Sequence, residues 1–210
     1  MTALRTLVLS LGLLAGSLPA AGHAAGWEVI EDADGIVVSQ RPVEGRRLPQ
    51  LRAQGEVEAT PLEILAVLLD VAAYPEWVPD CAEARLLQRI DAWRSLIYTR
   101  TGLPWPVLDR EAIVEQEVFF VREPVLLKVT FHAVAAPELP RARGTLRTGF
   151  AEGSYTIEAL GDGRRSRVTY EVQADPGGSV PDWLIRMQSR RNPLETLAGL
   201  RRQLEKTRRD

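Results

Sequence analysis

Hydrophobic and polar residues alternate along much of this chain, as they do in strands that bury one face. In residues 50–58, polar side chains fall on one side, and the other side carries Leu51, Ala53, Gly55 and Val57. Alternation or a short apolar run recurs in six further stretches: 82–87, 95–101, 109–117, 125–133, 155–159 and 168–174. Two short apolar runs within residues 27–43 flank the turn sequence DADG, and GDG lies between the runs at 155–159 and 168–174. The pattern predicts successive antiparallel strands of one sheet.

Residues 60–71 change to the signature of a helix. Thr60 can cap the helix, Pro61 takes the first helical position, and Glu63 can complete a capping box. The apolar run that follows has the length of a short helix, and it leads into a proline-rich turn that contains YPEW. We therefore expect one short helix between the first strands and the rest of the sheet.

Residues 179–204 predict a long amphipathic helix at the end of the chain. Apolar side chains recur there at helical spacing: Trp183, Leu184, Met187, Leu194, Leu197, Leu200 and Leu204. Ser179 is the expected cap. Pro193 is expected to kink the helix or restart it, with Asn192 as a second cap. The order of strands, short helix, many antiparallel strands and long helix predicts an α+β fold.

The first 24 residues have the features of a secretory signal peptide. Arg5 supplies a positive charge, an apolar stretch runs from Leu7 to about Ala15, and small residues follow. A membrane anchor is the alternative, but a bilayer span needs roughly 20 apolar residues. We expect cleavage after Ala24, a periplasmic or secreted protein, and a single domain over residues 25–210.

Charge and cysteine content limit which partners and cross-links this protein can have. The chain has 26 Lys and Arg against 28 Asp and Glu, and loss of the leader would bring the net charge to −3. This balance argues against a nucleic-acid partner. Cys81 is the only cysteine, so an intrachain disulfide is impossible. We expect a monomer that is held together by its core alone.

Signals for catalysis are weak. Without the leader only His132 remains among the histidines, on the polar side of its strand, and Cys81 suits a small buried apolar residue. The sequence has no GxSxG, no phosphate-binding glycine loop and no HExxH. We therefore expect no catalytic residue, no cofactor and no metal. A helix across such a sheet either packs solidly or encloses a ligand cavity, and the pattern alone favours the solid core.

Three motifs carry a resemblance to a known family. In order along the chain, YPEW (74–77), PWPVLDRE (104–111) and PDWL (181–184) resemble the lipid-transfer domains related to steroidogenic acute regulatory protein, the START family. The resemblance covers residues 27–204. It implies a helix-grip fold, in which a bent antiparallel sheet wraps the C-terminal helix and leaves a tunnel for a lipid or other apolar molecule.

Two features depart from that family. The expected secretion differs from its better-known intracellular members, and the paired Arg190 and Arg191 interrupt the apolar face that would roof the tunnel. Non-enzymatic binding and transport of a lipid-like ligand, with transient membrane contact, is the preferred function. An enzyme on the same scaffold, such as a cyclase or hydrolase of an apolar substrate, is the alternative. A partner-binding module with a filled core is a third possibility.

The inner strand faces and the long helix supply the candidate walls of the tunnel. The predicted ligand-binding residues are Trp77, Glu83, Trp105, Arg110, Val114, Val129, Phe131, Tyr155, Tyr170, Trp183, Leu184 and Met187. Ala112, Leu127, Ile157 and Val168 are further wall candidates. Each could instead be an ordinary core residue, and Trp77 and Trp105 could plug their loops against the core.

Arg110 is the most informative candidate because it shares a strand face with Ala112 and Val114. An unpaired buried charge costs several kcal/mol. We therefore expect a carboxylate partner or a polar ligand group beside it. The resemblance suggests an acid–arginine pair, for which Glu83 is the best match and Asp80 the reserve. The prediction is a polar anchor in an apolar cavity, and an outward-facing arginine is the alternative.

Overall fold

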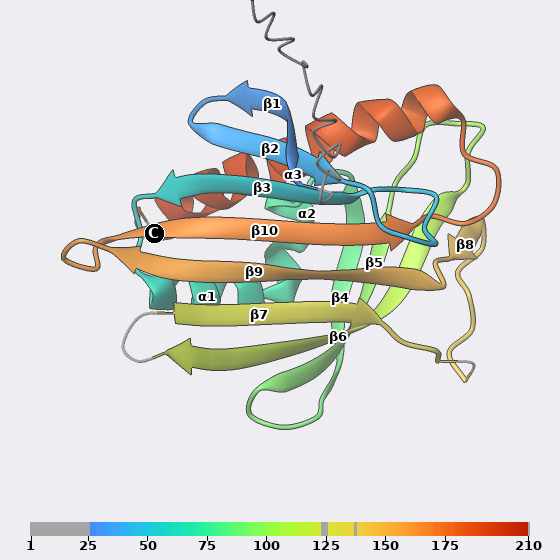
Figure 1. The fold of residues 1–210 in the computed structure, drawn as a ribbon. Helices are drawn as coiled ribbons and strands as arrows, with labels where there is room; N and C mark the ends of the chain where they lie inside the picture. The colour runs from blue at the N-terminus through green and yellow to red at the C-terminus, as the bar shows by residue number, and fades with distance from the viewer. Residues whose placement is uncertain (1–25, 123–125, 137, 210) are drawn as a thin grey trace, which may run out of the picture.

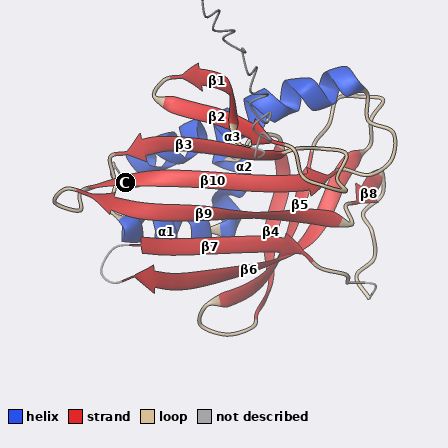
Figure 2. Ribbon diagram, in the orientation of Figure 1, coloured by secondary structure: helices blue, strands red, loops and turns tan. Residues whose placement is uncertain are grey.

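The computed structural model describes residues 26–122, 126–136 and 138–209, so the expected signal peptide lies outside the described residues. A ten-stranded sheet forms the body of the molecule (Figures 1 and 2). Its strands are β1 (Glu28–Ala33), β2 (Ile36–Arg41), β3 (Gln50–Val57), β4 (Cys81–Arg89), β5 (Arg94–Thr101), β6 (Asp109–Arg122), β7 (Leu126–Ala133), β8 (Thr145–Arg147), β9 (Phe150–Leu160) and β10 (Arg165–Asp175). The predicted α+β class and the antiparallel sheet are confirmed.

The strand order is β1-β2-β3-β10-β9-β7-β6-β5-β4, and neighbouring strands on this path are antiparallel. The last long strand, β10, therefore closes against β3 near the start of the chain. The short β8 was not predicted, and it pairs with β6 in parallel. Figure 1 shows β4 and β5 turned steeply relative to β9 and β10, so the sheet curls around a concave face.

Helices lie on the concave side of this sheet (Figure 2). They are α1 (Pro61–Leu69), a single 3-10 turn (Val71–Ala73), α2 (Tyr74–Trp77) and α3 (Asp182–Thr207). The predicted capping box starts α1: the Thr60 hydroxyl accepts from the Glu63 backbone N–H at 3.3 Å, and the Glu63 carboxylate accepts from the Thr60 backbone N–H at 2.7 Å. The curled sheet and its long C-terminal helix match the expected helix-grip arrangement.

The predicted cap of the terminal helix is wrong, and so is the predicted restart at Asn192. Pro181, and not Ser179, occupies the N-cap of α3, and no side chain caps this end. Pro193 lies inside one continuous helix, and Asn192 starts no second segment. A proline removes one backbone hydrogen bond from a helix. Buried side chains on both sides, Leu184 and Leu197, anchor the helix, and their packing outweighs that loss.

The main core fills one end of the concave face. Leu197, Leu200 and Leu204 of α3 pack there against apolar residues of α1 and the inner faces of β2, β3, β7, β9 and β10. Gly199 permits a close helix contact, because a Cβ atom at this position would lie 2.0 Å from the backbone oxygen of Trp77. The C-terminal half of α3 is therefore fixed against α2 and the core.

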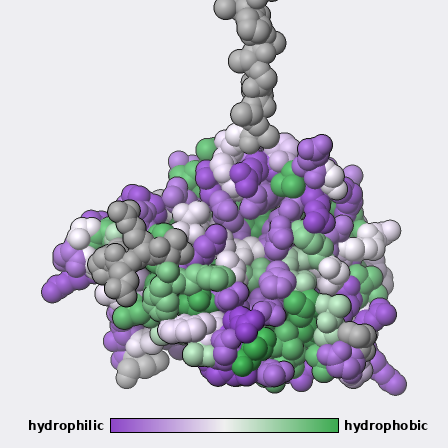
Figure 3. Space-filling model, turned by 60° about the horizontal axis from the view of Figure 1, so that its bottom comes forward, coloured by the Kyte–Doolittle hydropathy of each residue, from purple (hydrophilic) through white to green (hydrophobic). Residues whose placement is uncertain are grey.

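A second, smaller core lies on the opposite face of β5 and β6. Tyr98, Ile113 and Ala136 form it, with partly buried apolar residues packed around them. This explains why Ile113 breaks the alternation of its strand. At the end of β6, the exposed rings of Trp93 and Phe120 meet edge to face at 4.9 Å. Figure 3 brings the bottom of the molecule in Figure 1 forward and shows apolar patches between polar side chains.

Candidate functional site

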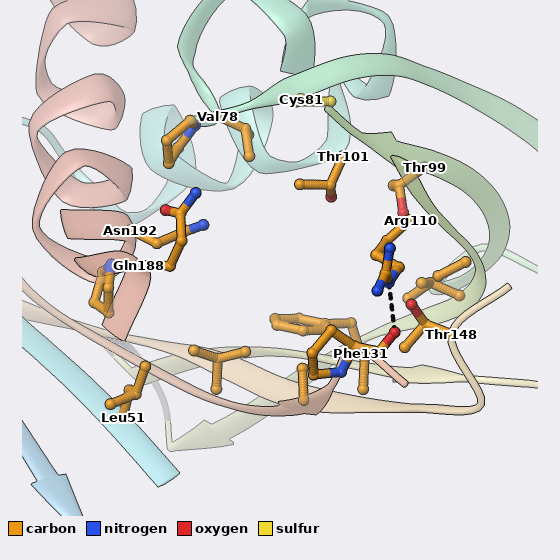
Figure 4. A pocket seen from close by; sticks show the side chains of 18 of the residues that line it. Leu51, Val78, Cys81, Thr99, Thr101, Arg110, Phe131, Thr148, Gln188 and Asn192 are labelled. Atoms are coloured by element: carbon orange, nitrogen blue, oxygen red, sulfur yellow. Dashed lines mark hydrogen bonds between the residues drawn. The ribbon is translucent and has the colours of Figure 1, made fainter. Parts of the chain in front are cut away.

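A cavity of about 380 Å³ lies between the N-terminal half of α3 and the inner face of the sheet (Figure 4). Leu184, Gln188 and Asn192 line it from the helix, one turn apart on a single stripe. The strands contribute mainly apolar and aromatic side chains together with Thr99 and Thr101, and a loop contributes Thr148. Ligand pockets span roughly 300–1,000 Å³ and have this mixture of apolar walls and few polar groups. The helix thus packs solidly at one end and roofs a cavity at the other.

Half of the predicted ligand-binding residues line this cavity: Arg110, Val114, Phe131, Tyr155, Tyr170 and Leu184. Ala112, a further wall candidate, also lines it. The alternation of β6, β7, β9 and β10 correctly identified which side chains face inward. Whether these residues contact a ligand stays a prediction.

The other half lies outside the lining of this cavity, and their contact with a ligand also stays a prediction. Trp77 and Val129 are buried in the main core, as are the wall candidates Leu127, Ile157 and Val168. Trp105 is 92% exposed in its loop. Trp183 and Met187 of α3 are 56% and 40% exposed. Glu83 forms ion pairs elsewhere.

Several lining residues were missed, and for two groups a signal existed. Leu184, Gln188 and Asn192 are spaced by four residues and therefore lie on one side of the helix. Because Leu184 was predicted to line the tunnel, Gln188 and Asn192 could have been predicted from this spacing. Thr99 and Thr101 continue the inward face of Ile97 on β5. Thr148 and Pro176 come from loops, where no periodicity is available.

Arg110 is buried to 7% exposure at the wall of the cavity. Its Nε donates to the Pro176 carbonyl at 2.6 Å, and its Nη2 donates to the Gly177 carbonyl at 3.0 Å. Its Nη1 donates to the carbonyl of Leu108. Burial lowers the pKa of this guanidinium, although an arginine stays protonated in proteins.

The predicted Arg110–Glu83 pair is wrong. The Glu83 carboxylate lies 3.5 Å from Nε of Arg85 and 3.5 Å from Nε of Arg100. The reserve candidate, Asp80, accepts a hydrogen bond from Gln188 at 3.0 Å and lies 3.5 Å from Arg191. Arg110 has no carboxylate partner within the described ranges. Backbone carbonyls hold it in place, and its positive charge stays uncompensated beside an apolar space.

Aromatic side chains cover another part of the cavity wall. Tyr155 and Tyr170 lie directly opposite each other on β9 and β10, with ring centroids 4.7 Å apart. Phe131 lies 6.2 Å from the first ring and 6.3 Å from the second. Gly153 makes room for it, because a Cβ atom there would lie 2.3 Å from the Phe131 ring. Burial, followed by the neighbouring tyrosines, raises the pKa of both hydroxyls.

Burial also shifts the pKa of two other titratable groups in the cavity wall. Burial raises the pKa of the Cys81 thiol to about 11, and that of Tyr74 to about 12. His132 is exposed and does not line the cavity. In the described part of the chain, no cluster of three or more His, Cys, Asp or Glu side chains could hold a metal ion. No described helix is both long and apolar enough to cross a membrane.

Comparisons with known proteins agree with this architecture. The START domain family matches residues 17–208. An uncharacterized protein of Pseudomonas aeruginosa is 31% identical over 205 residues, which cover 95% of this chain and 98% of that protein. The crystal structure of a STAR-related lipid transfer protein fragment from Xanthomonas axonopodis has 32% identity and a TM-score of 0.77, and covers 86% of this chain and 99% of that one. Mouse phosphatidylcholine transfer protein is 24% identical over 165 residues, covering 77% of this chain and 75% of its own length.

Proposed function

The chain belongs to the START domain family, and from this premise we propose that it binds one lipid or other apolar small molecule in its cavity and transports it. The observation that carries the proposal is the cavity itself, which lies under α3 with mainly apolar walls and one buried guanidinium. An amphiphilic ligand fits that combination, because its apolar part is driven out of water while a polar group meets Arg110.

Arg110 is the proposed polar anchor of the ligand. Three of its five N–H groups donate to backbone carbonyls, which fixes the guanidinium and leaves further donors. Since it lacks a carboxylate partner among the described residues, a ligand oxygen with negative charge would offset the cost of its burial. We therefore expect a carboxylate or phosphate group of the ligand at this end.

The proposal assigns no chemical step to the cavity. A general acid or base works best with a pKa near the operating pH. Arg110 keeps its proton, and the pKa values of Tyr155, Tyr170 and Cys81 are raised away from neutrality. These groups suit hydrogen bonding to a ligand better than proton transfer.

The size of the cavity suits a compact ligand. About 380 Å³ lies near the lower end of the usual range of roughly 300–1,000 Å³. Phosphatidylcholine, the lipid in the name of the mouse relative, carries two acyl chains. We propose a smaller ligand here, with one acyl chain or a fused-ring body.

We also propose that the protein is an exported monomer of the bacterial type, which acts in the periplasm or outside the cell. Arg5 and the apolar stretch after it support removal of a leader, and the intact mass of the exported protein tests it. Trp105 and Leu108 are exposed just before Arg110. Their exposure next to a cavity residue supports transient membrane contact during ligand exchange.

Native mass spectrometry of the protein isolated from its own cell envelope tests ligand binding. We expect an added mass that denaturation releases. In a displacement assay with a fluorescent fatty acid, Arg110→Met should weaken binding about tenfold or more, because a charged hydrogen bond contributes about 1.5–3 kcal/mol. Arg190→Met, an exposed change on α3, should leave affinity unchanged. Ligand-free protein that also fails to bind the fluorescent probe would refute the proposal.

A further inference from the structure

Two tyrosines, Tyr155 and Tyr170, place hydroxyl groups in the wall of the cavity. Tyr155 and Tyr170 are each 8% exposed, and both line the cavity. Their rings stack on each other, and Phe131 stacks on the Tyr170 ring and lies tilted against the Tyr155 ring, so the ring positions are fixed by packing on three strands. Phenylalanine rings at these two positions would complete the apolar wall equally well, as Phe131 does. The hydroxyls are therefore not needed for packing.

Neither hydroxyl has a hydrogen-bond partner among the described residues, whereas the other two of the four tyrosines do. The Tyr98 hydroxyl donates to the Glu111 carboxylate at 3.1 Å. The Tyr74 hydroxyl donates to the Leu68 carbonyl at 2.7 Å and accepts from Gln116 at 3.1 Å. The buried side-chain atoms without a partner in the described part of the chain are Nε1 of Trp77 and Oε1 of Gln188. The two hydroxyls are instead accessible from the cavity, so a ligand in the cavity can reach them.

The tyrosine pair lies far from Arg110 along the sheet. Arg110 is bonded to the carbonyl of Pro176, which follows β10, and Tyr170 lies six residues earlier in the chain. Six residues of extended strand span about 20 Å. The cavity thus has a cationic end at Arg110 and a second polar position at the paired hydroxyls, with apolar wall between them.

We propose that the hydroxyls of Tyr155 and Tyr170 form a second polar subsite, which binds a neutral oxygen of the ligand, a hydroxyl or a carbonyl. The inference rests on the proposed function and narrows the ligand class to amphiphiles that carry polar groups at two separated positions. Burial keeps both phenols protonated. Each can donate to a ligand oxygen, and each can also accept a hydrogen bond from a ligand hydroxyl.

A displacement assay with matched ligands tests the subsite. The probes are ω-hydroxy fatty acids of graded chain length, each compared with the parent acid that lacks the terminal hydroxyl. At the chain length that spans the two positions, the wild-type protein should bind the hydroxy acid about two- to tenfold more tightly, as one net hydrogen bond allows. Tyr155→Phe and Tyr170→Phe should remove this preference.

Tyr98→Phe is the matched control, because it makes the same chemical change on the opposite face of the sheet. It should lower the unfolding temperature and keep the preference. The two cavity variants should keep or raise the unfolding temperature, since they remove a hydroxyl that has no partner. The comparison of each hydroxy acid with its parent acid uses the wild-type protein, so it does not depend on whether a variant folds.

The outcomes separate the subsite from the proposed function. If the parent acids bind but no hydroxy acid binds better at any length, the subsite is refuted and the binding function stands. A preference that survives both phenylalanine substitutions also refutes it, because such a subsite would use only the ring faces. If neither series binds the wild-type protein, the proposed function fails, and the subsite fails with it.

Discussion

At the scale of single residues, Arg110 and Glu111 are neighbours on β6 that point to opposite faces of the sheet and have different roles. Arg110 faces the cavity and is held only by backbone carbonyls. Glu111 faces the opposite side, where its buried carboxylate accepts from Arg147 at 2.8 Å, from Tyr98 and from the Ala142 backbone N–H. The arginine has capacity left for a ligand, whereas the glutamate is fully used by the protein.

This difference predicts a structural role for Glu111. Glu111→Gln should lower the free energy of unfolding by about 2 kcal/mol, because it removes a charge from a buried hydrogen-bonded pair. Urea denaturation measures the loss. Glu115→Gln is the matched control on the same face of the same strand, since its pair with Arg94 is long, at 3.9 Å, and partly exposed. It should change stability by less than about 1 kcal/mol.

The ion pair between Glu111 and Arg147 also makes the stability of the fold depend on pH. Burial opposes ionisation of Glu111, but hydrogen bonds from Ala142, Arg147, Thr145 and Tyr98 outweigh it and lower its pKa below the ordinary 4.5. A carboxyl with a lowered pKa stabilises the fold above its ordinary pKa and loses that effect as the pH falls through the folded value. The stability gap between wild type and Glu111→Gln should therefore shrink below about pH 4.5. A gap that stays constant down to acid unfolding would contradict this role.

At the scale of elements, α3 has two halves with different tasks. Its C-terminal half is locked into the core, and its N-terminal half roofs the cavity with Leu184, Gln188 and Asn192. The packing of the C-terminal half depends on Gly199, because this residue contacts the backbone of Trp77.

Gly199→Ala should destabilise the protein although alanine is the better helix former by about 1 kcal/mol. The added Cβ atom would meet the Trp77 backbone oxygen at 2.0 Å, so α2 and α3 must move apart. Overpacking of this kind costs about 1–3 kcal/mol or more. Thermal unfolding measures the effect. Gly149→Ala is the control, since open space surrounds that position. An increase in unfolding temperature for Gly199→Ala would show that the contact is not limiting.

The elements were largely predictable from sequence, and their contacts were not. Period-two alternation identified most strands and the inward side of Arg110, because each strand buries one face. The Thr60 capping box is local, and it was correct. The predicted cap at Ser179 and the predicted restart at Asn192 failed, because tertiary packing of α3 overrides local preference. The Glu83 partner failed because strand pairing places it beside Arg100, and a single strand's alternation cannot reveal that neighbour.

At the scale of the whole molecule, the sheet closes around more space than α3 fills. The main core occupies one end of the concave face, and the cavity occupies the other. Solid packing there would bury more apolar surface and would stabilise the ligand-free protein. The protein therefore gives up stability to keep a binding space, and a ligand that fills this space should restore it by mass action.

A larger side chain that fills the cavity should raise stability and weaken ligand binding. Ala112 lies on its wall at 9% exposure, with open volume in front of it. Ala112→Leu should raise the free energy of unfolding of the ligand-free protein by about 1 kcal/mol, a usual gain for cavity filling. It should also weaken fatty-acid binding about tenfold, because the new isobutyl group occupies ligand space. Denaturation and probe displacement measure the two effects in parallel.

Ala66→Leu on the exposed side of α1 is the matched control. It makes the same substitution away from the cavity and should leave ligand affinity unchanged. A loss of stability in Ala112→Leu would mean that this wall has no room for a larger side chain. Unchanged affinity together with higher stability would mean that the ligand does not occupy the space in front of Ala112. Opposite changes in stability and affinity, confined to the cavity variant, are the result expected if the open space exists to hold a ligand.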